Sequence, residues 1–154
     1  MGPKTRREGG AGGVRDAHMP GGGDHMSDPT YVEEVDAITL TLQHYIDGAR
    51  SGHGADMNPA FHDLATIYGY ATIYGYVGED LFGGPIQDLY EWNDQNGPAT
   101  DIKTRIAALS IVGTCANVRL EIDNWIGPRF TDFFNLVKFD GHWKIVSKVF
   151  YLHP

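Results

Sequence analysis

The sequence predicts an α+β domain in which helices pack on one face of a strongly curved antiparallel sheet. Helical periodicity is confined to residues 30–52 and 85–97, whereas alternating strand patterns fill most of residues 102–152. The order is therefore helix, short helix, strand hairpin, helix and a meander of long strands, which is typical of helices segregated to one face of a sheet. The last two strands flank Asp140-Gly141, a strong signal for a tight hairpin.

Length, composition and charge indicate a single globular domain. The chain has 154 residues, of which 42% are hydrophobic and 21% are charged, so it is long enough to bury a core. Its net charge is -8, and this acidic balance argues against nucleic acid and anionic membranes as partners. No apolar run approaches the roughly 18 residues that a membrane span needs, so we expect no membrane partner.

The single cysteine and the glycine-rich start of the chain bear on its compartment. One cysteine, Cys115, excludes an internal disulfide framework and is typical of a reducing compartment, so we expect a cytoplasmic protein. Residues 1–27 lack the apolar segment of a signal peptide and have little to bury. We expect a disordered tail there, followed by one domain over residues 28–154. Translation from Met19 or Met26 is an alternative.

The first helix is predicted to begin after Thr30. Thr30 and Glu33 have the spacing of a capping box, and Pro29 disfavours an earlier start. Apolar residues then recur at helical spacing as far as Gly52, where the helix should end. Tyr45 lies on or beside this apolar stripe. It is either a core tyrosine whose hydroxyl reaches the rim or a hydrogen-bond donor inside a pocket.

A repeated segment follows the first helical region. The sequence ATIYGY occurs at residues 65–70 and again at 71–76. Six is an even number, so an inserted copy preserves the in-and-out alternation of a strand, at the cost of an overlong strand or a bulge. The tyrosines of the two copies are crowded. We therefore expect some of them to be exposed or to line a cavity, and Tyr68 is the candidate for ligand contact.

Proline and glycine delimit the elements around this repeat. Residues 54–62 predict a short helix that Pro59 starts or breaks, and residues 79–82 predict a short strand. Pro85 then opens a second long helix that closes at Gly97-Pro98. Trp92 contributes to the apolar side of this helix. Residues 102–126 predict a long hairpin with a turn at Gly113-Thr114.

A two-residue turn at Asp140-Gly141 sets the register of the last hairpin. In that register Phe134 lies opposite Ser147, and Asp132 lies on the same face as both. This face is otherwise nearly all apolar, so it should face the core. Lys148 falls on the opposite face, so this register argues against a direct pair between Lys148 and Asp132.

The connection around Gly127-Pro128 decides which residue lies opposite Asp132 on the preceding strand. A tight turn would oppose Asp123 and Asp132, two like charges, whereas one extra residue places Asn124 there. The second choice also gathers the apolar residues on one face. We therefore expect Asn124, Asp132 and Ser147 to form a small polar cluster on the apolar face of the sheet.

Two stretches resemble a known family. Residues 61–98, read with one copy of ATIYGY, and residues 131–150, TDFFNLVKFDGHWKIVSKVF, resemble the putative lumazine-binding group of the nuclear transport factor 2-like superfamily. The resemblance covers about residues 31–153. Its end motif, from Asp140 to Val146, is specific for the fold and carries little information about activity. The second ATIYGY departs from the family pattern, which has one copy.

The resemblance implies a cone-shaped, ketosteroid isomerase-like fold. In this fold a curved sheet wraps around the first helix and leaves an apolar cavity open at one end. The superfamily includes ketosteroid isomerase-like enzymes, dehydratases, polyketide cyclases and binding proteins, and many members are dimers that pack through the outer face of the sheet. The expected partners are accordingly a small apolar or aromatic molecule and a second copy of the chain.

In such a cone, Asp132 would line the cavity. A carboxyl group among apolar side chains resists ionisation, so its pKa should be raised. It would then act as a general base or, when protonated, donate a hydrogen bond to an oxyanion, with Tyr45 as a partner donor. The alternative is a structural role in which Asn124, Ser147 or a backbone amide holds Asp132 and the residue only stabilises the strand register.

Other side chains complete the predicted site. His62 is a candidate proton carrier at the mouth of the cavity, although a residue in that place more often caps or packs. The candidate ligand-binding residues are Asn124, Ser147, Phe134, Trp92 and Tyr68. The domain has no phosphate-binding glycine loop, no paired cysteine or histidine site and no nucleophile elbow. We therefore expect neither a cofactor nor a metal.

Two functional hypotheses remain open at this point. The first is a protein that binds a small molecule and acts on it as a cofactor-free isomerase, dehydratase or lyase through acid–base chemistry. The second is a non-catalytic ligand-binding or dimeric assembly module. The expected dimer contacts are on the outer face: Phe133, Val137, Val146 and Phe150. A pocket in which Asp132, Asn124 and Tyr45 converge would favour the first hypothesis.

Overall fold

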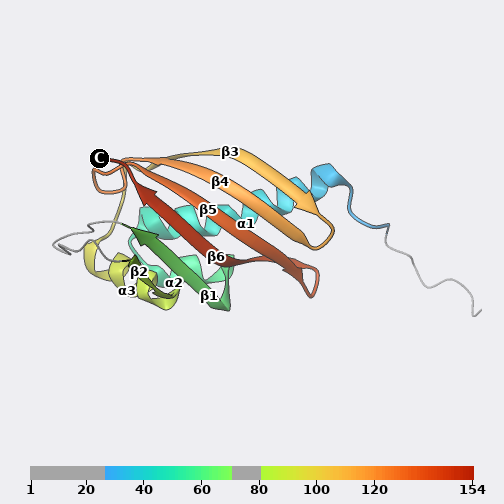
Figure 1. Cartoon of the computed structure of the whole chain (residues 1–154), viewed down its shortest axis with the longest axis horizontal. Helices are drawn as coiled ribbons and strands as arrows, with labels where there is room; N and C mark the ends of the chain where they lie inside the picture. Colours follow the sequence, from blue (N-terminus) through green and yellow to red (C-terminus); the bar gives the residue numbers. More distant parts are fainter. Residues whose placement is uncertain (1–26, 71–80) are drawn as a thin grey trace, which may run out of the picture.

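The computed structural model describes residues 27–70 and 81–154. Nearly all of the predicted N-terminal tail and the second copy of ATIYGY lie outside these residues. In the described part of the chain, a curved six-stranded sheet is covered on one face by helices (Figure 1). The α+β class predicted from the order of elements is therefore confirmed.

The helices and strands follow the predicted order closely. The helical elements are α1 (Tyr31–Ser51), α2 (Gly54–Met57), a 3-10 turn (Asn58–Ala60) and α3 (Gln87–Asn96). The strands are β1 (Phe61–Tyr70), β2 (Leu81–Pro85), β3 (Lys103–Val112), β4 (Cys115–Asp123), β5 (Phe130–Phe139) and β6 (His142–Leu152). Pro85 ends β2, and α3 begins two residues later than predicted. The pyrrolidine ring is compatible with the last position of this edge strand because it removes only an unneeded donor.

The sheet has the spatial order β2-β1-β6-β5-β4-β3. All neighbouring strands are antiparallel except β1 and β6, which run parallel. Pairing of the first strand with the last places β1 and β6 in the middle of an open, curved sheet, and α1 runs along its inner face (Figure 1). The inner sheet face and α1 thereby enclose the hydrophobic core.

Both predicted ends of α1 are confirmed. The backbone N–H of Glu33 donates to the Thr30 side chain at 3.2 Å, and the Glu33 carboxylate accepts from the Thr30 N–H at 2.7 Å. At the other end Gly52 has a φ of 78°, in the left-handed region where glycine is favoured. Between these caps the helix buries one stripe against the sheet: Ile38, Leu42, Tyr45, Ile46 and Ala49.

The register of the last hairpin changes along its length. Next to the turn, Leu136 pairs with Ile145, as predicted, but the next pair is Asn135 with Ser147. Val146 is therefore an extra residue, and a β-bulge shifts the remainder of β6 by one position. Residues beyond the bulge exchange faces, so Lys148 lies on the inner face and Ser147 on the outer face.

The same shift corrects the predicted outer face and polar cluster. Phe150, expected to face outward, pairs with Asp132 and is buried in the core. The Ser147 hydroxyl accepts from the Asn135 amide at 3.0 Å on the outer face. Ser147 therefore does not join Asp132, because one inserted residue reverses the alternation on which its placement depended.

The connection between β4 and β5 is wider than predicted. Leu120, rather than Asn124, pairs with Asp132. Asn124 instead lies in the loop with a φ of 59°, and its side-chain oxygen accepts from the Gly127 N–H at 3.0 Å. The predicted Asn124–Asp132 contact is thus wrong, because the loop uses Asn124 for its own turn. The predicted face of β4 was nevertheless correct, because Leu120 lies on the inner face together with Asp132.

Candidate functional site

The centre of the candidate site is a hydrogen bond between α1 and β5. The Tyr45 hydroxyl donates to Oδ2 of Asp132 at 2.6 Å, and each residue is 1% exposed. Tyr45 belongs to the apolar stripe of α1, and Asp132 occupies an inward position of β5. Tyr45 is thus a buried hydrogen-bond donor to the inward-facing Asp132. Their catalytic roles remain predictions.

Lys148 completes this buried group. Its Nζ lies 3.8 Å from Oδ2 of Asp132, and the Lys148 side chain is 4% exposed. Lys148 was predicted on the other face of the sheet, and the bulge after Ile145 turns it inward. We refer to Tyr45, Asp132 and Lys148 as the buried triad.

Three aromatic rings surround the Lys148 amine. Nζ lies 4.9 Å from the ring centroid of Tyr45, 5.1 Å from that of Trp125 and 5.6 Å from that of Phe150. Such distances allow cation–π attraction to the ammonium form. Water is largely excluded here, so these rings and Asp132 are the groups that offset the cost of burying the charge.

Burial changes the proton affinity of all three members of the triad. Desolvation raises the pKa of Asp132, although the Lys148 charge and the Tyr45 hydrogen bond oppose it. Desolvation lowers the pKa of Lys148, and the Asp132 charge opposes that shift. Burial and then the Asp132 charge raise the pKa of Tyr45 well above its usual value. Burial therefore favours the neutral forms of Asp132 and Lys148 more than water does.

Two polar atoms at the triad lack a hydrogen-bond partner in the described part of the chain. They are Oδ1 of Asp132, an acceptor, and Nε1 of Trp125, a donor. Buried polar atoms are normally paired, and leaving one unpaired costs about 1–3 kcal/mol. A molecule with its own donor and acceptor, bound beside the triad, would satisfy both atoms.

Aromatic side chains form the walls of this region. The Phe134 ring packs edge-on against Tyr45 at 5.3 Å between centroids, and the Trp125 ring packs against Tyr45 at 5.6 Å. Trp92 is one layer further away, at 6.2 Å from Trp125. Phe134 thus contacts the triad directly, whereas Trp92 reaches it through Trp125. Their contact with a ligand remains a prediction.

The structure places two other predicted residues away from the triad. Nδ1 of His62 accepts from the Leu64 N–H at 3.0 Å, and its ring packs against Phe139. Its neighbour Phe61 is the one that turns inward, so His62 is not brought to the triad, and its role as a proton carrier stays a prediction. Tyr68 is 40% exposed and lies over Gly83. It therefore does not face the triad either.

Sequence reasoning missed Lys148 and Trp125. A bulge without glycine leaves no clear signal in the β6 sequence, so alternation assigned Lys148 to the wrong face. Trp125 lies just after the end of β4. The residues on either side of it, Asn124 and Ile126, have left-handed backbone angles, and these turn the Trp125 side chain back into the core. A buried tryptophan cannot be predicted from the loop sequence, because its position depends on those backbone angles.

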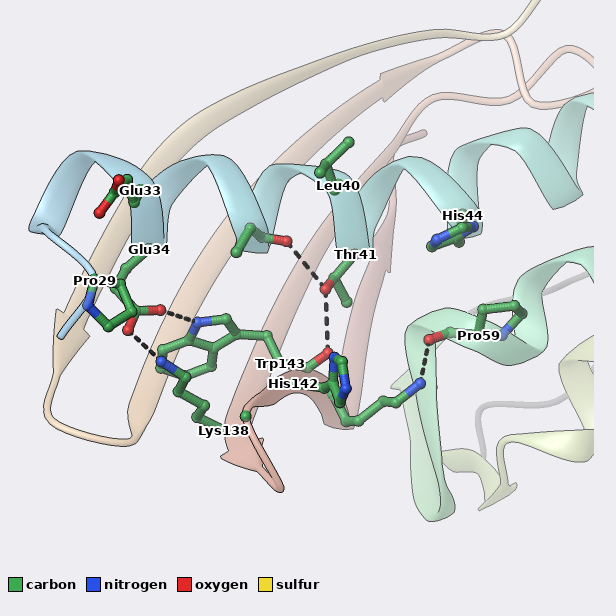
Figure 2. A pocket seen from close by; sticks show the side chains of 13 residues that line it. Pro29, Glu33, Glu34, Leu40, Thr41, His44, Pro59, Lys138, His142 and Trp143 are labelled. Atoms are coloured by element: carbon green, nitrogen blue, oxygen red, sulfur yellow. Dashed lines mark hydrogen bonds and ion pairs between the residues drawn. The ribbon is translucent and has the colours of Figure 1, made fainter. Parts of the chain in front are cut away.

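A separate open pocket lies between the N-terminal half of α1 and the β5–β6 hairpin (Figure 2). Its volume is about 380 Å³. Glu34 accepts hydrogen bonds there from Lys138 and from the Trp143 indole. The hydrogen bond from Lys138 is the largest cause that lowers the pKa of Glu34, and the bond from Trp143 lowers it further. Glu34, Lys138 and Trp143 thus satisfy one another in this pocket.

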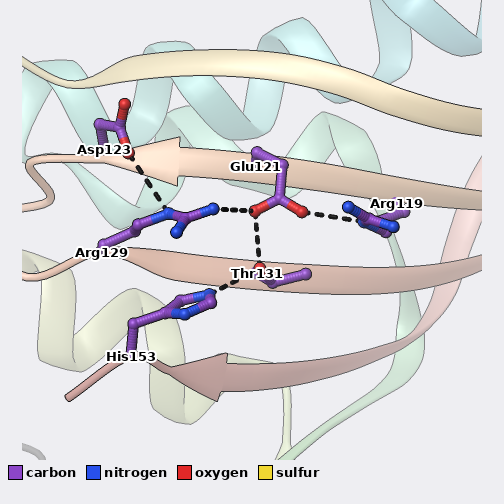
Figure 3. Close-up of polar contacts among 6 residues, drawn as sticks. All are labelled: Arg119, Glu121, Asp123, Arg129, Thr131 and His153. Carbon is purple, nitrogen blue, oxygen red and sulfur yellow. Dashed lines mark hydrogen bonds and ion pairs between the residues drawn. The ribbon is translucent and has the colours of Figure 1, made fainter.

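The outer face carries its own polar network (Figure 3). Glu121 accepts from Thr131 at 2.6 Å and pairs with Arg119 and Arg129. The hydrogen bond from Thr131 and the two arginines lower the pKa of Glu121. This network links β4 to β5 on the side of the sheet opposite the triad.

Two further features of the described residues concern membranes and metal ions. None of the helices in ranges 27–70 and 81–154 is both long and apolar enough to cross a membrane. Within the same ranges, the histidine, cysteine and carboxylate side chains form no group of three that could hold a metal ion.

Comparison with known proteins extends over most of the chain. Residues 33–151 match the family model described as "Putative lumazine-binding". The chain is 33% identical over 122 residues to "Aldolase FrzH" of Cladobotryum sp, covering 79% of this chain and 93% of that protein. The match to the family model includes all three residues of the triad.

Solved structures show the same fold. An NTF2-like protein of unknown function from Shewanella baltica is 42% identical, with a TM-score of 0.76 and coverage of 82% of this chain and 99% of that one. One from Methylobacillus flagellatus is 45% identical, with a TM-score of 0.73 and coverage of 81% and 96%. A ketosteroid isomerase-like protein from Erwinia carotovora atroseptica shares the fold at 14% identity, with a TM-score of 0.59 and coverage of 79% and 98%. The chain thus belongs to the putative lumazine-binding family of NTF2-like cone-fold proteins.

Proposed function

We propose that this protein binds a small, mostly apolar carbonyl compound beside the buried triad and moves a proton at the carbon next to the carbonyl group. The reaction class is that of a cofactor-free isomerase or lyase. The observation that carries the proposal is Oδ1 of Asp132, a buried carboxylate oxygen without a partner in the described residues. Its sister oxygen, Oδ2, is held by Tyr45.

The two oxygens of Asp132 would have different tasks. Tyr45 orients the carboxyl group through Oδ2, so Oδ1 is the atom available to take a proton from a bound molecule. Burial raises the pKa of Asp132 and so makes its carboxylate a stronger base than a solvated one. The nearby Lys148 charge favours the negative oxygen that develops on the carbonyl compound.

The surroundings select the kind of molecule that fits this role. Phe134, Trp125 and Phe150 offer aromatic surface to an apolar or aromatic body, and the Trp125 indole N–H offers one donor. The printed name of the Cladobotryum relative is an aldolase. Aldol chemistry begins with loss of a proton next to a carbonyl group, which is the step proposed here.

Hydrogen–deuterium exchange in simple ketones tests this proposal. Wild-type protein in heavy water should exchange the protons next to the carbonyl group of cyclohexanone or acetophenone, measured by proton NMR. Asp132→Asn should lower that rate by about 10²–10⁴-fold, because a positioned base contributes that much. The matched control is Glu34→Gln, which removes a hydrogen-bonded carboxylate from the separate pocket and should leave exchange unchanged.

The pKa of Asp132 supplies an independent measurement. NMR titration should give a value above the ordinary one for aspartate, about 3.9, because burial is the largest cause of its shift. An ordinary pKa, or exchange that Asp132→Asn does not slow, would contradict the proposal and favour a non-catalytic binding role.

We also propose that two copies of the chain associate through the outer face of the sheet. The register places Tyr68, Val149 and Phe133 side by side across β1, β6 and β5, and each is at least 40% exposed. A contiguous apolar row of this kind is unusual on a surface that faces only water. We propose a cytoplasmic location as well, because a single cysteine is typical of a reducing compartment.

A charge in this row should disrupt the dimer. Phe133→Glu places a carboxylate at the centre of the proposed contact and should convert a dimeric wild type into a monomer, measured by sedimentation equilibrium at micromolar concentration. Leu40→Glu is the matched control, since Leu40 is an exposed apolar residue on α1, away from this row. A wild type that sediments as a monomer would refute the dimer.

A further inference from the structure

We infer that Lys148 is a covalent site, at which Nζ forms an imine with the carbonyl carbon of an aldehyde or ketone bound beside Asp132. This inference rests on the proposed function, because it needs a carbonyl compound at the triad. It adds a residue role and a covalent intermediate to that function. It also narrows the ligand to carbonyl compounds whose carbonyl carbon can reach a buried amine.

Lys148 is poorly explained as a stabilising residue. Its Nζ is 3.8 Å from Oδ2 of Asp132, whereas the Tyr45 hydroxyl is 2.6 Å from the same oxygen. The shorter contact therefore occupies the oxygen nearest to the amine, and the ion pair is loose. A buried ion pair recovers its desolvation cost only with close geometry. Buried ionisable groups with a perturbed pKa cluster at functional sites, and burial lowers the pKa of Lys148.

The contrast with the other described lysines supports a special role for Lys148. Lys138 pairs with Glu34, and Lys144 donates to the Pro59 carbonyl at the protein surface. Lys103 is exposed on β3. In ranges 27–70 and 81–154, only Lys148 combines burial with a position among aromatic rings. These are the surroundings in which a lysine amine becomes a nucleophile.

The charges around Lys148 determine its protonation. Asp132 on β5 and Tyr45 on α1 face the amine, together with the uncharged rings of Trp125 and Phe150. Burial lowers the pKa of Lys148, and the negative charge of Asp132 is the opposing cause. When Asp132 takes up a proton, that opposition disappears. Proton transfer from Lys148 to Asp132 would therefore generate the neutral amine and the neutral acid together.

The covalent step balances without an added reagent. The Nζ lone pair attacks the carbonyl carbon, a C–N bond forms, and the C=O π pair moves to oxygen, which takes the proton of the Asp132 acid. The nitrogen then loses a proton to the Asp132 carboxylate. That proton is returned to the hydroxyl group as the C–O bond breaks, so one water leaves and a C=N bond remains.

The same groups can then carry out the proton step of the proposed function. A protonated imine acidifies the neighbouring C–H bond, and the Asp132 carboxylate removes that proton to leave an enamine. The enamine carbon can attack a second carbonyl group and form a C–C bond, or the reverse sequence can break one. Water finally hydrolyses the imine and releases Lys148. Asp132 serves as acid and base in turn, as expected for a carboxyl group with a raised pKa.

Reductive trapping with cyclohexanone tests the imine directly. Native protein is incubated with cyclohexanone and sodium cyanoborohydride, which reduces imines to stable amines, and is then digested and mapped by mass spectrometry. The peptide that contains Lys148 should carry one cyclohexyl group and should be labelled ahead of the peptide that contains the exposed Lys103, because burial lowers the pKa of Lys148 and favours its neutral amine. Mapping in the wild type needs no variant, so a folding defect cannot obscure this result.

Variants separate the covalent role from the acid–base role. Lys148→Arg keeps the charge but cannot form an imine, so it should abolish both labelling at this peptide and exchange in cyclohexanone. Lys144→Arg is the matched control and should retain both. Circular dichroism and urea unfolding of Lys148→Arg show whether it is folded, and Asp132→Asn keeps the amine while removing its acid and base.

The outcomes distinguish failure of this inference from failure of the proposed function. Exchange that depends on Asp132, persists in Lys148→Arg and comes without label on Lys148 would overturn the imine and leave the acid–base function intact. Wild-type protein with neither exchange nor label would overturn both. Label spread equally over Lys103, Lys144 and Lys148 would also overturn the inference, since Lys148 would then have no special reactivity.

Discussion

Replacing Lys148 by methionine should lower the free energy of unfolding by about 3–5 kcal/mol at neutral pH, the cost of leaving one member of a buried ion pair alone. Methionine keeps a similar volume but removes the charge that faces Asp132. The remaining carboxylate would be buried among aromatic rings, with Tyr45 as its hydrogen-bond donor. Urea denaturation measures this difference, and Lys144→Met, at a surface lysine, should change stability by no more than about 0.5 kcal/mol.

The loss should shrink at low pH. Burial raises the folded-state pKa of Asp132 above its value in the unfolded chain, and losing Lys148 raises it further. As the pH rises, the unfolded chain releases this proton first. The folded state therefore loses stability from the unfolded pKa, about 3.9, upward through the folded pKa. Below that range Asp132 is neutral in both states, and most of the penalty disappears.

A double variant separates charge from packing. Asp132→Asn combined with Lys148→Met removes both charges and keeps an acceptor for the Tyr45 hydroxyl. Replacing both members of a buried pair is often neutral or even stabilising, so the double variant should recover most of the loss. A single variant that is equally unstable at every pH, or a double variant no more stable than the single one, would show that the charges do not control the effect.

Replacing Phe134 by alanine should lower the free energy of unfolding by about 3–5 kcal/mol, the range for truncating a buried phenylalanine. Phe134 is fully buried on β5 and packs edge-on against Tyr45. The cavity would lie directly beneath the triad, so the pKa shift of Asp132 should also decrease if water enters. Urea denaturation and NMR titration measure these two effects.

The neighbouring residue is a matched control for this substitution. Phe133→Ala removes the same atoms from the adjacent position of β5, which is 46% exposed on the outer face. It should cost much less, and both variants are compared at low protein concentration so that association through the outer face contributes little. Equal losses would mean that the alternation of β5 is not the one described.

The buried triad lowers the stability of the folded state. Its charges are desolvated, one ion pair is loose, and two polar atoms lack partners within the described residues. Natural proteins commonly retain such costs at functional sites. The stability effects expected for the Lys148 variants and the proposed function therefore involve the same residues.

Local patterns predicted the elements well, and they predicted part of the site. The capping box at Thr30, the glycine at residue 52 and the Asp140-Gly141 turn each act within a few residues, so the sequence identifies them directly. The inward direction of Asp132 followed from strand alternation on the side of the turn that lacks the bulge. Its contact with Tyr45 required the packing of α1 against β5, which the resemblance to a cone fold suggested and the structure shows.

The errors in the predicted contacts have a common physical origin. A bulge or a longer loop inserts residues into the strand pairing, and local sequence patterns do not reveal these insertions. The extra residue at Val146 moved Lys148 inward and Ser147 outward. The wider loop after β4 removed Asn124 from Asp132 and turned Trp125 into the core. His62 and Tyr68 lie away from the triad because their direction depends on how β1 pairs with β6, a partner distant in the chain.

By itself, the sequence determined the α+β class, the limits of most elements and an acid on the core side of the last hairpin. These depend on periodicity, caps and turns, which are properties of neighbouring residues. Only the tertiary structure decided that this acid is partnered by a buried lysine and a tyrosine rather than by an asparagine and a serine. Strand register beyond a bulge or a long loop is set by which side chains the whole core can bury, and that balance involves residues from α1, β4, β5 and β6 together.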